Sequence, residues 1–253
     1  MAGRSTTFDN YSFHGADGLF LGNIIHSYGR VVIASENFIE PWENLLVANN
    51  VASDLGLWFI STDVGNSQSS KPIDKVIVRG NQVAFNADTS LGGLKAGLLQ
   101  SHKLPISYIE VSDNYFEMAS PTAGIVSVGV TSQEVSPRTS YTEHLKVSGN
   151  TFNKMEFGVW VDNLDFLDQV KNLEYVNNTC LNMQDLGMHP EAAGLWADGS
   201  ASQHIENLVI TGNRFINEAN HAGYQFGIVL GSYIDNLYLA GCGKNGGRGE
   251  ISL

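Results

Sequence analysis

Two segments of the chain carry the same chemically useful pattern, a tryptophan followed two residues later by an aspartate. They are Trp160-Val-Asp162 and Trp196-Ala-Asp198. An indole offers a flat apolar face beside a polar edge, which suits stacking on a sugar ring. If the two segments stack in register on adjacent strands, their carboxylates lie about 5 Å apart. Two carboxylates at that distance cannot both ionise freely, so the pKa of one is raised. That arrangement is the acid and nucleophile pair of a retaining glycoside hydrolase. We therefore predict Asp162 and Asp198 as a catalytic pair.

Polar residues in the intervening loops form a second candidate group. His189 and Glu191 follow the first tryptophan segment, and Glu218 and His221 occupy the equivalent loop one repeat later. Such side chains could bind a metal or act as acid and base. Their spacing matches no metal signature, so no metal or other cofactor is expected, and solvated surface loops explain them equally well. We assign His189, Glu191 and His204 to the walls of the sugar site.

A repeated asparagine block indicates which elements position these residues. The block reads Val147-Ser-Gly-Asn-Thr-Phe152 in its clearest copy, with an apolar residue two places before it. Its asparagines are spaced 31, 33, 36, 28 and 35 residues apart, a period typical of a solenoid. We expect these asparagines to be structural, at bends where their amides bond to copies in neighbouring coils. The asparagines are Asn50, Asn81, Asn114, Asn150, Asn178 and Asn213.

A second block, a glycine followed by two apolar residues, lies between the asparagine blocks. It begins at Gly56, Gly97, Gly124, Gly158, Gly194 and Gly227. Because strand side chains alternate between faces, we expect the second residue after each glycine to point outward. A contiguous exposed apolar column indicates an interface or a binding groove. The expected outward column consists of Trp58, Leu99, Val126, Trp160, Trp196 and Val229.

Two short apolar strands per repeat, separated by turns, resemble the right-handed parallel β-helix of the pectate-lyase and phage-tailspike superfamily. The blocks that carry this resemblance run from Gly18 to Cys242. We therefore predict an all-β, right-handed parallel β-helix solenoid of about seven coils over residues 18–253. Residues 1–17 match no repeat and are expected to be a lead-in or the start of a fragment. In this fold the two Trp-x-Asp segments would lie on adjacent coils.

The resemblance implies a tailspike-like protein that binds and cleaves a bacterial surface polysaccharide. Tailspikes of this family are usually homotrimers, which the apolar column would explain. In that interpretation Trp58, Trp160 and Trp196 bind the sugar beside the catalytic aspartates. Two alternatives remain open: a secreted polysaccharide lyase or epimerase, and a non-catalytic shaft or adhesin. The apolar column could also be buried against neighbouring chains, with both aspartates as rim or turn residues. No lysine–arginine constellation of the pectate-lyase type is evident on a strand face.

The charge and hydrophobic content of the chain argue against some classes of partner. The chain has 26 acidic and 14 basic residues, a net charge of −12, and the basic residues do not cluster in the sequence. Nucleic acid is therefore not expected as a partner. With 43% hydrophobic and 16% charged residues, neither disorder nor membrane insertion is expected. Cys180 and Cys242 are expected to be free thiols. No signal peptide is evident, so we expect a virion location or an extracellular one reached by another route.

Overall fold

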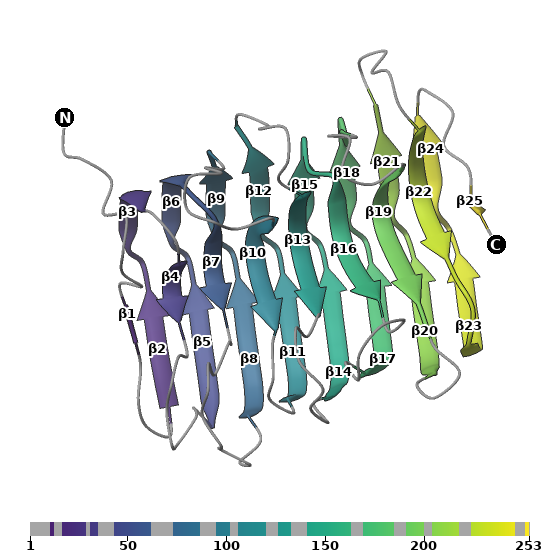
Figure 1. The fold of residues 1–253 in the computed structure, drawn as a ribbon, viewed down its shortest axis with the longest axis horizontal. Coiled ribbons are helices and arrows are strands. Elements are labelled where there is room, and N and C mark those ends of the chain that lie inside the picture. Colours follow the sequence, from purple (N-terminus) through teal and green to yellow (C-terminus); the bar gives the residue numbers. More distant parts are fainter. Residues whose placement is uncertain are drawn as a thin grey trace.

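The computed structural model places three parallel sheets around one long axis (Figure 1). It describes residues 11–12, 17–28, 31–34, 43–61, 73–86, 95–101, 106–119, 126–132, 141–162, 169–184, 191–199, 204–217, 224–245 and 251–252. The three sheets are labelled A, B and C. After β1, successive strands along the chain belong to sheets B, C and A in turn, and three such strands make one coil. β2 and β23 lie at opposite ends of the stack (Figure 1).

The strands of each sheet are stacked in sequence order. Sheet A contains β1 (Tyr11–Ser12), β4 (Val31–Ala34), β7 (Trp58–Ser61), β10 (Lys95–Ser101), β13 (Val126–Ser132), β16 (Phe157–Asp162), β19 (Glu191–Asp198), β22 (Tyr224–Leu230) and β25 (Ile251–Ser252). Sheet B contains β2 (Asp17–Leu21), β5 (Asn44–Ala48), β8 (Ile73–Arg79), β11 (Ile106–Ser112), β14 (Tyr141–Ser148), β17 (Gln169–Val176), β20 (Ile205–Thr211) and β23 (Ile234–Ala240). Sheet C contains β3 (Ile24–Tyr28), β6 (Val51–Leu55), β9 (Gln82–Phe85), β12 (Tyr115–Met118), β15 (Thr151–Asn153), β18 (Thr179–Leu181), β21 (Arg214–Ile216) and β24 (Gly243–Asn245).

All the pairings between these strands are parallel, for example β8 with β11 and β11 with β14. The predicted all-β parallel β-helix is therefore confirmed. The sheets contain eight or nine strands each, so the count differs from the seven coils expected. β1, within the segment predicted as a lead-in, pairs with β4 and is thus part of sheet A.

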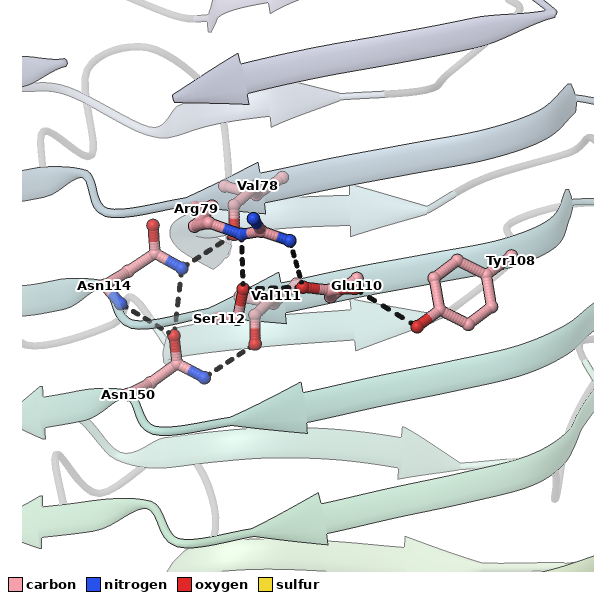
Figure 2. Close-up of polar contacts among 8 residues, drawn as sticks. All are labelled: Val78, Arg79, Tyr108, Glu110, Val111, Ser112, Asn114 and Asn150. Carbon is pink, nitrogen blue, oxygen red and sulfur yellow. Dashed lines mark hydrogen bonds and ion pairs between the residues drawn. The ribbon is translucent and has the colours of Figure 1, made fainter. Parts of the chain in front are cut away.

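The repeated asparagines form a buried ladder at the corner between sheets B and C. Asn81 donates both its backbone N–H and its Nδ2 to Oδ1 of Asn114, each at 2.9 Å. Asn114 in turn donates Nδ2 to Oδ1 of Asn150 and to the carbonyl of Val78, both at 2.9 Å (Figure 2). The predicted structural role is confirmed. The left-handed backbone lies one residue before the asparagine, for example at Gly149 with φ of 68°, where glycine avoids a Cβ clash.

The interior beside the ladder is filled by apolar stacks. Phe116 and Phe152 stack with ring centroids 5.7 Å apart, and the column continues through Cys180 to Phe215. Cys180 is buried and lies 3.1 Å from the Tyr175 hydroxyl, and burial raises the pKa of this thiol to about 12. Both cysteines are free, as predicted. Phe116 and Phe152 are fully buried, and Phe215 packs against the same core.

The register of sheet A corrects the predicted alignment of the glycine blocks. Gly97 is opposite Trp58 and Val128, whereas Leu99 is in the row of Val159. Gly97 is thus one position out of step with Gly158, so Leu99 faces the interior rather than solvent. Gly124 lies outside the described residues. The error arose because the buried hydrophobic pattern and the turns, and not the position of glycine in the sequence, set the register.

Candidate functional site

The two Trp-x-Asp segments lie side by side on β16 and β19. Trp160 pairs with Trp196 and Asp162 pairs with Asp198, as expected for adjacent coils. Trp160 is only 5% exposed, and its ring stacks on Phe157 with centroids 5.0 Å apart. Trp196 contacts the same Phe157 edge-on at 6.0 Å and is half-buried. The indoles thus pack into an aromatic cluster, and only Trp196 retains a substantial exposed surface.

The rest of the expected outward column is also covered within the single chain. Val126 and Val229 are buried in the same cluster as Trp160, and Trp58 is buried with the main core. These side chains therefore do not form the exposed apolar patch from which a homotrimer was predicted. Assembly as a homotrimer stays a prediction without that support. The exposed large apolar residues lie elsewhere, with Leu19, Leu21, Ile24 and Val51 near the amino-terminal end of the stack.

Asp198 has a structural contact that bears on its predicted role. Its Oδ1 accepts the backbone N–H of Ser232 at 2.7 Å, which caps the turn between β22 and β23. His204 contacts the same corner, with Nδ1 2.7 Å from Oδ1 of Asp235 and its ring 5.3 Å from that of Tyr233. The structure thus brings Asp198 and His204 to one corner through the Ser232–Tyr233 turn.

The remaining predicted site residues cannot be placed in this way. His189, Glu218 and His221 lie outside the described residues. Asp162 and Glu191 are described only as strand residues, Asp162 beside Asp198 and Glu191 beside Tyr224. Among the residues that the structure describes, no group of three or more His, Cys, Asp or Glu side chains could hold a metal.

A different cluster, on the outer face of sheet B, has the geometry of a site that is organised in advance (Figure 2). Three outward positions of β8, β11 and β14 are in register. The first row contains Lys75, Tyr108 and His144, the second Ile77, Glu110 and Lys146, and the third Arg79, Ser112 and Ser148. Equivalent atoms in neighbouring coils are about 4.8 Å apart. We call this group the sheet B cluster.

Glu110 is the centre of the hydrogen-bond network in the sheet B cluster. Its Oε1 accepts from Arg79 Nη2 and from Ser112 Oγ, each at 2.8 Å, and its Oε2 accepts the Tyr108 hydroxyl at 3.2 Å (Figure 2). Partial burial alone would raise the pKa of Glu110. The hydrogen bonds from Ser112 and Arg79 outweigh burial, so the pKa lies below its usual value. Glu110 is therefore ionised at neutral pH and holds its three donors in place.

Tyr108 is the aromatic platform of this cluster. The ammonium of Lys75 lies 5.3 Å from the centroid of its ring, within the range of a cation–π contact. The His144 ring comes from the neighbouring strand β14, with its centroid 6.1 Å from that of Tyr108 and the two ring planes tilted by 42°. Burial and then the negative charge of Glu110 raise the pKa of Tyr108, so the phenol stays protonated and donates to Glu110. The ring is thus held between two neighbours and oriented by a third.

Several donors and acceptors of the cluster remain available. Arg79 is 53% exposed, and no described residue accepts a hydrogen bond from its Nη1. Within the described part of the chain, Lys75 has no ion-pair partner. His144 Nδ1 has no hydrogen-bond partner there either, but it is buried and so is not accessible to a ligand. Lys75 and Arg79 lie on the same face of β8.

The row of Lys75, Tyr108 and His144 continues into an exposed asparagine ladder. Asn207 donates Nδ2 to Oδ1 of Asn172 at 2.6 Å, and Asn236 donates to Asn207 at 3.1 Å. Asn172 donates to the carbonyl of Glu143, the residue before His144. The sequence carried a signal for this row, since Asn172, Asn207 and Asn236 each precede a leucine at the same position of the repeat.

Comparisons with known proteins add no further assignment. No family model, curated protein or solved structure matches this chain. The described residues contain no helix of the length and apolar character needed to cross a membrane. A parallel β-helix supports many activities, so the function has to be argued from the geometry of the surface.

Proposed function

We propose that the protein binds a bacterial surface polysaccharide, as a tailspike does, and that the sheet B cluster is the binding surface. The observation that carries this proposal is the Tyr108 ring, held by Glu110 and flanked by Lys75 and His144. Protein sites for sugars combine a flat aromatic face with hydrogen-bonding groups around it. Ligand binding costs less when those groups are already fixed in place, and the Glu110 network fixes them here.

The shape of the face also favours a polysaccharide. Its outward side chains repeat about every 4.8 Å along the solenoid axis, from Lys75 through Asn236. An extended row of hydrogen-bonding groups suits a linear polymer with repeating polar groups. Solenoids use such long surfaces for extended ligands. A protein partner would favour a more apolar patch. The exposed Leu19 and Leu21 lie on β2, three coils away from Tyr108 on β11, and the outward Ile77 on β8 is only partly exposed.

The test compares Tyr108→Ala with a matched control, Tyr115→Ala. Tyr115 is on the next strand, β12, and donates to Glu117, which also binds the cation Lys154. The two tyrosines thus have similar surroundings on different sheets. On a panel of bacterial capsules and lipopolysaccharides, the wild type should bind at least one glycan. Tyr108→Ala should weaken that binding about tenfold, the effect of losing about 1–1.5 kcal/mol of aromatic contact. Equal loss in both variants would contradict the proposal.

Cleavage of the bound glycan is a second candidate function, favoured by the register pairing of Asp162 with Asp198. If the pair is catalytic, Asp162→Asn should lower release of reducing ends by several orders of magnitude with the thermal midpoint unchanged. Asp198→Asn should lower activity and also stability, because Asp198 caps the Ser232 turn. Unchanged activity in both variants on a glycan that the wild type cleaves would exclude this pair and leave a binding protein.

Location and assembly follow from the proposed role. A protein that meets bacterial surface glycans would act outside the cell or as part of a virion. A homotrimer is the assembly proposed by resemblance to tailspikes. Sedimentation of the full chain at micromolar concentration would test this assembly, and a stable monomer would contradict it.

A further inference from the structure

We infer that the sheet B cluster selects glycans that carry anionic groups, through Lys75 and Arg79. This inference rests on the proposed glycan-binding function and adds the chemical class of the ligand. The unusual feature is the charge of these two side chains. The whole chain has a net charge of −12, yet Lys75 and Arg79 extend from the same face of one strand, on either side of Ile77.

Arg79 has N–H donors that no described residue uses, and Lys75 has a positive charge that no described carboxylate pairs with. Glu110 and Ser112 fix the Arg79 guanidinium through Nη2 and Nε, at 2.8 and 3.3 Å. A guanidinium has five N–H donors, so donors including both on Nη1 remain for a ligand. Lys75 is exposed and its ammonium lies over the Tyr108 ring. Its positive charge is not balanced by an ion pair within the described residues, so an anion could approach it directly.

The neighbouring carboxylates do not cancel this preference. Glu110 is the nearest, and its charge is compensated by the ion pair with Arg79. Arg79 therefore offers a ligand its free N–H donors, and Lys75 supplies the unpaired positive charge. Glu174 is the next outward acid in the row of Glu110, two strands away beyond Lys146. Asp17 is in the row of Lys75, two strands away on the other side, and accepts a hydrogen bond from Asn44. The exposed Asp74 directly precedes Lys75. Between Lys75 and Arg79, a glycan above β8 and β11 therefore meets the Lys75 ammonium, the free donors of Arg79 and the Tyr108 ring, and the one carboxylate among them, Glu110, is paired with Arg79.

The spacing indicates an extended ligand and not one small anion. Lys75 and Arg79 are four residues apart on a strand, about 13 Å between their Cα atoms. A polymer with an anionic group on more than one sugar could satisfy both cations and lay a ring on Tyr108. Nucleic acid is the competing polyanion, but two cations on an acidic protein do not form the long basic tract that it needs.

The experiment measures binding of the full chain to matched charged and neutral glycans. The probes are alginate oligosaccharides and their carboxyl-reduced, neutral counterparts, with poly(glycerol phosphate) as a phosphate arm and single-stranded DNA as a nucleic-acid arm. The wild type should bind alginate or the phosphate polymer at least tenfold more tightly than the neutral glycan. The tighter of the two identifies the anionic group. The preference should shrink between about 50 mM and about 300 mM salt.

Variants locate the preference. Lys75→Gln has no described ion pair to disturb, so it should lower affinity for the anionic probe about tenfold and affinity for the neutral glycan by a smaller factor. Arg79→Gln should act in the same direction. Lys154→Gln, which removes the cation of the similar Tyr115–Glu117 group on sheet C, should leave the preference unchanged. Thermal midpoints of all variants show whether they are folded.

The possible outcomes separate the two proposals. Equal wild-type affinity for charged and neutral glycans would overturn the anion selectivity and leave the glycan-binding function standing. Absence of binding to these probes and to the whole surface-glycan panel would overturn both. Tighter binding of single-stranded DNA than of either anionic polymer would overturn the assignment of a glycan. An unchanged preference in Lys75→Gln and Arg79→Gln would show that the selectivity comes from another surface.

Discussion

Replacing Glu110 by glutamine tests whether the carboxylate organises the sheet B cluster. Glutamine keeps the shape and one carbonyl acceptor but loses the charge. Glu110 accepts three hydrogen bonds and its side chain is 15% exposed, whereas its partner Arg79 is half-exposed. An ion pair with one solvated partner stabilises by about 0.2–1 kcal/mol. The hydrogen bonds from Ser112 and Tyr108 would also weaken. We therefore expect Glu110→Gln to lower the free energy of unfolding by about 1–2 kcal/mol at neutral pH.

The stabilisation of the folded protein by Glu110 should decrease at low pH. The folded-state pKa of Glu110 lies below its usual value. The carboxylate therefore stabilises the folded protein above the unfolded-state pKa, and this contribution is lost as the pH falls through the folded-state pKa. Urea unfolding of wild type and Glu110→Gln at pH 7 and at about pH 3 should show the difference in free energy shrinking at the lower pH. A difference that stays constant or grows on acidification would refute the role of the Glu110 charge.

Three further predictions concern the scaffold. Asn114→Ala should lower the free energy of unfolding by about 4 kcal/mol, because four buried side-chain hydrogen bonds are lost at about 1 kcal/mol each. Asn207→Ala on the exposed ladder should lower it by under about 1 kcal/mol. Equal losses of stability in urea unfolding would contradict this. Gly194→Ala should lower the free energy of unfolding by about 1–3 kcal/mol, because its Cβ would collide with Phe215 and the Gly227 carbonyl. A Cβ at Gly243 meets nothing within 4 Å. A similar loss in Gly243→Ala would therefore contradict the packing explanation. Cys180 should resist alkylation in the native protein at pH 8, since burial keeps its thiol protonated; modification as fast as in the urea-unfolded chain would contradict its burial.

The fold could be predicted because its strongest constraint is local and repeated. Each ladder asparagine must fill the same corner in every coil, so Asn81, Asn114 and Asn150 recur with their neighbours. Inward and outward positions of sheet B then follow by alternation. Sheet A was less predictable, because its glycines make room for different side chains. Gly97 faces Trp58, whereas Gly194 makes room for Phe215, and counting from glycine placed Leu99 on the wrong face.

The candidate site was less accessible to sequence reasoning for a physical reason. Adjacency of Trp160 and Trp196 followed from the repeat, but their coverage by Phe157 depends on tertiary packing. The sheet B cluster joins residues from strands 33 and 36 positions apart, such as Lys75, Tyr108 and His144. Alternation shows that each faces outward. Only the register of three coils shows that they meet, and only the side-chain contacts show that Glu110 binds both Arg79 and Tyr108.

Hydroxyl-radical footprinting with a bound surface glycan tests the central claim most directly. The measurement compares oxidation of side chains with and without the glycan that the wild type binds most tightly. The sheet B cluster predicts protection of Tyr108 and His144, with no change at Tyr115 on sheet C. Protection of Trp196 with Tyr108 unchanged would contradict the assignment and place the glycan on sheet A.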